Sequence, residues 1–378
     1  MICPVLKLAK QLIQKPSVSP DDHGCQIILI NRLKKLGFSI EVMSCNDTTN
    51  LWAYHGKEGK TLAFSGHTDI VPAGAIQNWR YPPFTPTLNK GFLYGRGSVD
   101  MKGSLAAMIV AAEKFISDFP NHPGRLAFLI TSDEEGKANN GTVKIVDNLM
   151  TRNEKIDYCI IGEPSSQVKL CDTIKNGRRG SLTCKLIIKG IQGHIAYPHL
   201  VNNPIHSSLC FLNELINKKW DIGNSFFSPT SLQIFNIYSG AASNNVTPSE
   251  LIIQFNFRFS NELTEKQICN QVETILKKYQ FNYKIEWELS SYPFLTKKGK
   301  LIDIVSEIIE KYCYYKPKLS TDGGTSDGRF ITRMGTQIVE LGLLNKTIHK
   351  IDECVSIVDL QILNFIYQQI IKKILLGI

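Results

Sequence analysis

The first residues that could do chemistry are a histidine and an aspartate in the segment SGHTD. His67 and Asp69 are two residues apart, so on an extended chain their side chains point to the same side. A carboxylate beside an imidazole can accept a hydrogen bond from one ring nitrogen and leave the other free to bind a metal ion. A pair this short also occurs in ordinary loops and is a weak signal alone.

Four later segments add acids and a second histidine. Asp100 lies in the glycine-rich turn GRGSVDMKG, Glu134 and Glu135 lie in SDEEG, Glu163 lies in GEP, and His349 stands near the C-terminus. Singly, these residues are typical of a helix N-cap, a solvated acidic loop and a surface histidine. Together they supply nitrogen and oxygen ligands of the kind that zinc or manganese accepts, and adjacent acids repel one another unless cations offset them. We therefore predict a hydrolase with two metal ions.

The elements that must position these residues alternate in the first part of the chain. Short apolar runs at 61–65, 125–131 and 157–161 predict strands, and the segments 104–119 and 143–150 predict helices. This alternation favours an α/β fold with a mainly parallel, buried sheet. In such a sheet, functional residues gather beyond the carboxyl ends of the strands, which is where most of these acids and His67 fall.

From about residue 180 the pattern changes to half-exposed strands and two helices. The expected order β-α-β-β-α-β is that of a split βαβ domain, and the α/β pattern returns after Pro293. The expected domains are a catalytic domain formed by 1–179 and 293–378, and an inserted domain at 180–292. The strands and helices expected in the inserted domain lie at 182–189, 204–220, 232–238, 250–259, 262–279 and 283–289.

Five segments together resemble the di-zinc aminoacylase and carboxypeptidase family of metal-dependent amidohydrolases. They are SGHTDIVP, YGRGSVDMKGSLAA, TSDEEG, IGEPSS and GGTSDGRF, and the resemblance extends from residue 10 to about 355. It implies a di-zinc exopeptidase-like catalytic domain with a mainly parallel central sheet, and an inserted ferredoxin-like α+β domain that dimerises and acts as a lid. Within this family, IKNGRRGSL, GHIAYPHLVNNP, SNNVTPSEL and FNFRFS are similar to members that remove a succinyl group from an amino acid.

The resemblance also implies a ligand set for two zinc ions per subunit, which cobalt is able to replace. Asp100 would bridge both ions. His67 and Glu163 would complete one site, and Glu135 and His349 would complete the other.

The resemblance further implies roles for residues that bind no metal. Glu134 would be the general base and Asp69 would orient His67. His194 would come from the partner subunit of a homodimer and stabilise the tetrahedral oxyanion. Arginine binds carboxylates through two parallel hydrogen bonds, which suits a small-molecule substrate with several carboxylates. The residues expected to bind that substrate are Arg178, Ser181, Asn244, Asn245, Arg258, Gly324 and Thr325.

Composition excludes several other classes of protein. The net charge of +9 comes from lysines that are scattered, whereas a nucleic-acid-binding protein concentrates them. No run approaches the ~18 apolar residues of a membrane span. The 10 cysteines include no C-x-x-C pair, which favours free thiols in the cytoplasm. We expect a soluble enzyme, while an N-acetylornithine deacetylase, a dipeptidase or a non-catalytic metal-binding interaction protein remain alternatives.

Overall fold

The computed structural model describes residues 3–240 and 243–378. The chain forms two compact units. The first unit contains Met1–Gly177, Leu295–Ser320 and Ser326–Ile378, and the second contains Arg178–Phe294 and Thr321–Thr325. No helix within the described ranges is long and apolar enough to cross a membrane.

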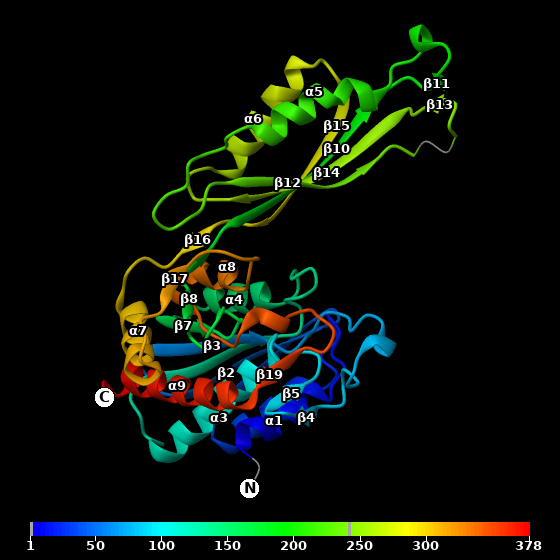
Figure 1. Cartoon of the computed structure of the whole chain (residues 1–378). Helices are drawn as coiled ribbons and strands as arrows, with labels where there is room; N and C mark the ends of the chain where they lie inside the picture. Colours follow the sequence, from blue (N-terminus) through cyan, green and yellow to red (C-terminus); the bar gives the residue numbers. More distant parts are fainter. Residues whose placement is uncertain (1–2, 241–242) are drawn as a thin grey trace. The chain divides into compact units, whose positions relative to one another are not determined.

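The first unit is built on a mixed, mainly parallel sheet in the order β1-β2-β6-β3-β7-β18-β8-β17 (Figure 1). The central strands β6, β3, β7 and β18 are parallel, and β1 and β2 add an antiparallel edge. Every residue of β3 and β7 is buried, as expected for strands covered on both faces. The bounds are β1 Ser39–Cys45, β2 Thr48–Gly56, β3 Thr61–His67, β6 Arg125–Thr131, β7 Tyr158–Ile161, β8 Thr173–Lys175, β17 Lys318–Ser320 and β18 Gln337–Glu340.

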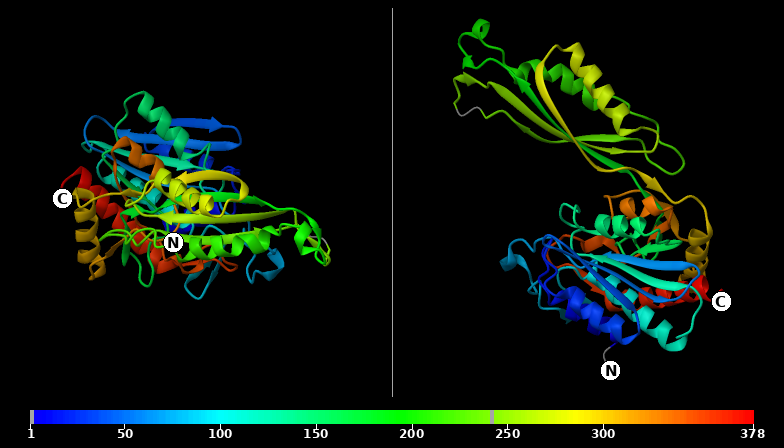
Figure 2. Two further views of the ribbon diagram at one scale, coloured as in Figure 1. Left: turned by 90° about the horizontal axis from the view of Figure 1, so that it is seen from above. Right: turned by 180° about the vertical axis from the view of Figure 1, so that it is seen from behind.

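Helices cover both faces of this sheet. Helices α1, α3 and α9 pack together on one face, and α4 and α8 lie on the other (Figures 1 and 2). Helix α3 is buried from Leu105 to Ala112, so it forms part of the main core cluster instead of a surface layer. The bounds are α1 Pro4–Ile13, α2 Cys25–Lys35, α3 Lys102–Asp118, α4 Thr142–Thr151, α7 Lys300–Cys313, α8 Gly328–Ile331 and α9 Ile357–Leu375.

A small three-stranded sheet in the first unit has the order β19-β5-β4. It consists of β4 (Thr87–Asn89), β5 (Phe92–Tyr94) and β19 (Cys354–Ser356). Because β19 pairs with β5, the segment that follows His349 lies beside the turn that leads to Asp100. Two residues far apart in the sequence are thereby brought to the same place.

The second unit is a four-stranded antiparallel sheet with two helices, in the order β12-β14-β10-β15. In chain order this is 2-3-1-4, the ferredoxin-like arrangement that the split βαβ pattern predicts. Alternate residues of β14 are buried, because one face of the sheet carries α5 and α6. The bounds are β10 Gly180–Lys189, α5 Pro204–Asn217, β12 Ser231–Tyr238, β14 Glu250–Phe259, α6 Glu265–Lys278 and β15 Asn282–Ser291. The predicted fold class is confirmed for both units.

Candidate active site

The parallel strands of the first unit bring the predicted ligands to one edge of the sheet. His67 is the last residue of β3 and pairs with Thr131, the last residue of β6. The SDEEG turn therefore begins beside His67. Strand β7 pairs with β3 on the other side, so Glu163 follows from that strand to the same edge. Asp100 joins them from the turn before α3.

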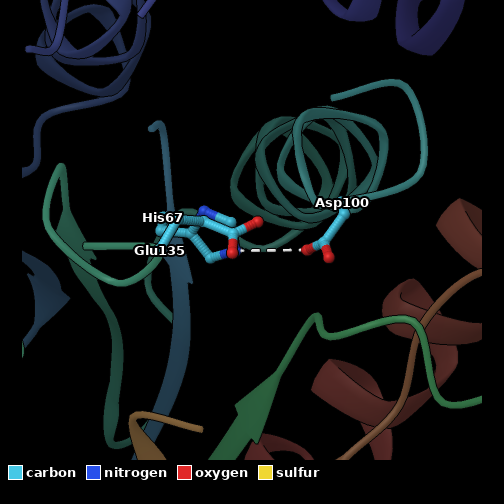
Figure 3. Close-up of side chains that lie close together, drawn as sticks. All are labelled: His67, Asp100 and Glu135. Carbon is cyan, nitrogen blue, oxygen red and sulfur yellow. Dashed lines mark ion pairs between the residues drawn. The ribbon is translucent and has the colours of Figure 1, made fainter. Parts of the chain in front are cut away.

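Asp100 lies between the two histidines. Its Oδ1 is 3.3 Å from His67 Nε2, and its Oδ2 is 3.2 Å from His349 Nε2. His67 Nε2 is also 3.5 Å from Glu163 Oε1, and His349 Nε2 is 3.0 Å from Glu135 Oε1. Figure 3 shows Asp100, in the turn before α3, facing His67 and Glu135. The ion pairs thus form two sets of nitrogen and oxygen atoms that share one carboxylate.

Two observations indicate that this cluster fits cations. His67 Nε2 and Asp100 Oδ1 are buried and face each other at 3.3 Å, but neither makes a hydrogen bond of normal geometry with any residue that the structure describes. Buried polar atoms without partners are costly, whereas a metal ion would satisfy both of them. Two overlapping groups also have their ligand atoms within 4.8 Å of one another, namely His67 with Asp100 and Glu135, and His67 with Glu134 and Glu163. Distance alone therefore does not separate Glu134 from the ligands.

The His67 ring is fixed by a main-chain group. Its Nδ1 donates a hydrogen bond to the carbonyl oxygen of Asp69 at 2.9 Å, so Nε2 of the neutral ring presents its lone pair to the cluster. The Asp69 carboxylate, which is fully buried, lies 3.6 Å from the same Nδ1. That carboxylate also accepts hydrogen bonds from the main-chain N–H groups of Glu134 and Glu135, at 3.2 and 3.1 Å. Asp69 therefore holds the SDEEG turn as well as lying beside His67.

The third acid of the SDEEG turn has a different role. Asp133 accepts hydrogen bonds from the main-chain N–H groups of Ala138 and Asn140, at 3.2 and 3.1 Å. Its carboxylate therefore shapes the loop that follows instead of facing the histidines. Asp133 thus stabilises the loop, and Glu134 and Glu135 supply the carboxylates that enter the cluster.

Crowding of acids changes their proton affinities. Burial, together with the Glu163 carboxylate, raises the pKa of Glu134 well above its ordinary value. Burial and the nearby Asp100 raise the pKa of Glu163 to about 7. For Asp100 burial also raises the pKa, but the close contacts with His349 and His67 outweigh this effect and hold the pKa below its usual range. Without a cation, the cluster therefore retains protons that a bound metal would displace.

Eight of the predicted residues lie in the second unit, and three of them, His194, Asn244 and Asn245, are neighbours. His194 is exposed in β11 (Gly193–His194), which pairs with β13 (Val246–Thr247). Ile195 directly follows His194, and its main-chain N–H donates a hydrogen bond to the carbonyl oxygen of Asn245. Asn244 and Asn245 therefore lie beside this histidine. His194 Nδ1 accepts a hydrogen bond from the main-chain N–H of Ala196 at 3.1 Å. In the neutral ring, the proton is then on Nε2, which is available as a donor.

The other five predicted residues of the second unit lie around Arg178 and Arg258. Arg178 is 7% exposed and donates from Nη1 to the carbonyl oxygen of Asp322 at 2.9 Å, beside Gly324 and Thr325. Ser181 lies directly opposite Arg258 in the pairing of β10 with β14. The structure therefore places Arg178 and the 321–325 turn together in the second unit, whereas the sequence pattern assigned both to the catalytic domain.

Sequence reasoning missed two buried acids near the cluster. Asp327 accepts a hydrogen bond from Thr142 Oγ1 at 2.6 Å, and burial raises its pKa to about 6. Glu353 is fully buried and binds the turn that carries Asp100. Asp327 lies within the quoted segment GGTSDGRF, which was a usable signal, whereas KIDECVS gives no local sign that Glu353 is buried.

Comparisons with known proteins agree with this architecture. Residues 63–373 match the sequence model of peptidase family M20/M25/M40. An M20 family metallo-carboxypeptidase from Sulfolobus solfataricus is similar in structure, with a TM-score of 0.82 and 19% identity over 98% of this chain and 99% of that chain. A tripeptidase from Staphylococcus aureus has a TM-score of 0.79 and 20% identity, over 98% of this chain and 97% of that chain. A dipeptidase from Saccharomyces cerevisiae has a TM-score of 0.72 and 17% identity, over 97% of this chain and 95% of that chain.

At these identities, the similar structures establish the fold alone. The family assignment depends on the sequence model, which matches most of the chain from β3 into α9. That match confirms the predicted resemblance at the level of the family. This protein belongs to peptidase family M20/M25/M40 and is a metallohydrolase of peptide or amide bonds.

Proposed function

We propose that this protein is a succinyl-diaminopimelate desuccinylase. It would convert N-succinyl-LL-2,6-diaminopimelate and water into succinate and LL-2,6-diaminopimelate, a step of lysine and diaminopimelate biosynthesis. The observation that carries the hydrolytic chemistry is the position of Asp100, whose two carboxylate oxygens face His67 and His349 at 3.3 and 3.2 Å. The narrower choice of substrate is supported by the segments around Arg178 and Arg258.

The ligands that we propose fall into the two sets that share Asp100. His67 and Glu163 would hold one ion, and Glu135 and His349 would hold the other. Imidazole and carboxylate suit zinc, and cobalt accepts the same ligands. When bound, two such ions lower the pKa of a water molecule and polarise the amide carbonyl.

Glu134 is the residue that we propose moves the proton. It would accept a proton from the attacking water as the C–O bond forms, and would deliver that proton to the amine nitrogen as the C–N bond breaks. In the metal-free protein burial and Glu163 raise its pKa, whereas bound cations would lower that pKa and leave the carboxylate able to accept a proton. The hydrogen bond from its main-chain N–H to the Asp69 carboxylate fixes the backbone position from which the Glu134 side chain extends.

We propose that the second unit supplies the groups that recognise and stabilise the substrate. His194 of the partner subunit would donate from Nε2 to the oxyanion, and the Ala196 N–H on Nδ1 favours that tautomer. Arg178 and Arg258 would bind carboxylates of the substrate, with Ser181 beside Arg258 in the sheet. Further hydrogen bonds would come from the amides of Asn244 and Asn245 and from the main chain of Gly324 and Thr325.

We also propose that the second unit is the dimerisation domain. Strand β12 is at the edge of its sheet, and Phe235 and Tyr238 on it are 59% and 61% exposed. Leu209 and Ile216 of α5 are each 57% exposed. An open sheet edge with exposed apolar side chains is a surface that a second copy of the chain would cover.

The test is a side-by-side measurement of kcat/KM with zinc-loaded protein on N-succinyl-LL-diaminopimelate, N-acetylornithine and a dipeptide. A large preference for the succinyl substrate supports the proposal. A preference for N-acetylornithine or for the dipeptide would agree with metal-dependent hydrolysis but would contradict the proposed substrate. Hydrolysis of none of the three by protein that holds metal would contradict the proposed reaction.

A further inference from the structure

Arg96 and Glu353 form a buried ion pair beside the cluster, although neither is a proposed metal ligand. Their side chains are 3% and 0% exposed, and Arg96 Nη1 lies 2.9 Å from Glu353 Oε2. The two residues are 257 positions apart in the sequence. A buried pair of this kind is costly to break by removing one partner, because the other charge is left uncompensated.

The Glu353 carboxylate organises the turn that ends at Asp100. Oε2 accepts hydrogen bonds from Arg96 Nη1 and from the Gly97 N–H, at 2.9 and 3.0 Å. Oε1 accepts from the N–H groups of Val99 and Asp100, at 2.8 and 3.1 Å. Each oxygen therefore accepts two donors, and one of the donors belongs to the residue that would bridge the two ions.

Arg96 extends the same network to two other segments. Nη1 also donates to the carbonyl oxygen of Lys350 at 3.0 Å, and Nη2 donates to that of Pro72 at 3.4 Å. Lys350 directly follows His349, and Pro72 lies three residues after Asp69. One ion pair thus contacts the chain beside His349, beside Asp69 and at Asp100.

The segment from His349 to Glu353 needs such an attachment. His349 and Asp352 have φ values of 58° and 59°, in the left-handed region that non-glycine residues seldom adopt. Conformations of this kind persist where surrounding contacts hold them. Glu353 supplies such contacts at the end of the segment, next to the pairing of β19 with β5 (Figure 1), and the Arg80 N–H donates a further hydrogen bond to Asp352 Oδ1 at 2.8 Å.

We propose that Glu353 is a positioning residue, which acts through Arg96 and the main-chain N–H groups of the 97–100 turn to set the placement of Asp100 and His349 toward each other. This inference rests on the proposed function, since it assumes that these two residues bind metal. Groups that orient metal ligands without touching the metal affect affinity strongly, by about 10–100-fold when they are mutated.

Glu353→Gln tests the proposal without changing the volume of the side chain. A glutamine has one acceptor oxygen, so its NH₂ group must face two of the four donors that the carboxylate satisfies. The matched control is Glu113→Gln, which breaks the Arg32–Glu113 ion pair of 2.7 Å elsewhere in the first unit. Zn²⁺ affinity of the metal-free proteins is measured by isothermal titration calorimetry, and the Co²⁺ forms are compared by visible absorption.

We expect Glu353→Gln to weaken Zn²⁺ binding by about 10–100-fold and to alter the Co²⁺ spectrum, while Glu113→Gln changes neither. Unchanged affinity and an unchanged spectrum in folded Glu353→Gln would overturn the proposal, whatever happens to its melting temperature. If that variant does not fold, Glu353→Asp, which keeps both oxygens but has a shorter reach, is measured in the same way. Failure of both variants to fold would also overturn it, because Glu353 would then be required for the fold itself. Wild-type protein that binds no metal would instead contradict the proposed function.

Discussion

Replacing Glu134 with glutamine should separate catalysis from metal binding. Glutamine has the same shape, and the main-chain hydrogen bond from residue 134 to Asp69 is retained, so the turn should stay in place. The variant loses only the ability to accept a proton. Other carboxylates cannot readily replace it, because Asp100 and Glu163 lie 3.3 and 3.5 Å from His67 and Glu135 lies 3.0 Å from His349.

The expected loss follows from these contacts. General-base catalysis contributes about 10²–10⁴-fold, which corresponds to about 2.7–5.4 kcal/mol of transition-state stabilisation. Since the neighbouring carboxylates are engaged, we expect Glu134→Gln to lower kcat/KM by about 10³–10⁴-fold. The assay is hydrolysis of the preferred substrate, with metal content measured by atomic emission on the same samples.

Stability provides an independent check on the same variant. The pKa of Glu134 is raised in the folded protein by burial and by Glu163, so its ionised form opposes folding once the pH exceeds the pKa of an unfolded glutamate. Metal-free Glu134→Gln should therefore melt at the same temperature as metal-free wild type or higher, at neutral pH. Calorimetric melting curves of the two metal-free proteins test this.

The matched control is the same substitution at the next residue. Glu135→Gln removes the carboxylate that contacts His349 and should lower metal content, whereas Glu134→Gln should retain both ions. This contrast is informative because Glu134 lies close enough to His67 and Glu163 to be a ligand itself. Metal loss in Glu134→Gln, or substantial remaining activity, would refute the assignment of Glu134 as the base.

Three further predictions concern pH, the oxyanion and the substrate. In metal-free protein the pKa of Glu163 is raised from 4.5 to about 7 and that of His349, by Asp100 and Glu135, from 6.5 to about 10. The raised pKa of Glu163 makes the metal-free protein less stable as the pH rises from 4.5 to about 7, and the raised pKa of His349 does so as the pH rises from 6.5 to about 10. Metal binding, in contrast, needs both groups deprotonated. The difference in melting temperature between metal-loaded and metal-free protein should therefore widen between about pH 6 and about pH 9, and a constant difference would contradict these shifts. His194→Ala should lower kcat by about 10²–10³-fold with metal content unchanged; release of zinc would show that this histidine is a ligand instead. Arg258→Lys, which keeps the charge but loses the planar fork, should raise KM for the succinyl substrate more than for N-acetylornithine, and equal effects on both would remove its role in selectivity.

Much of the site could be predicted because its residues follow strands. The apolar runs that end at His67, Thr131 and Ile161 identify β3, β6 and β7, and parallel strands bring their carboxyl ends to one edge. Glu134, Glu135 and Glu163 come soon after those ends, so local sequence was sufficient to place them together. The alternation in β14 likewise identified the antiparallel sheet of the second unit.

The parts that the sequence did not reveal depend on contacts between distant segments. The edge strands β1 and β2 were not predicted, since β1 is only partly buried and has no continuous apolar run. Asp69 contacts the main chain of Glu134 and Glu135, which lie 65 and 66 positions away in the sequence. Glu353 contacts the turn before Asp100, which lies more than 250 positions away. Nothing local distinguishes a carboxylate that organises a distant turn from one that faces water.

In the proposed function, one chain holds two metal ions around Asp100, and hydrolysis requires them. The most direct test is to remove metal with a chelator, add back Zn²⁺ in steps, and measure bound metal and substrate hydrolysis on the same samples. We expect two ions per chain at saturation, no hydrolysis by the metal-free protein, and recovery of hydrolysis as the ions bind. Binding of fewer than two ions at full activity, or hydrolysis that persists without metal, would contradict it.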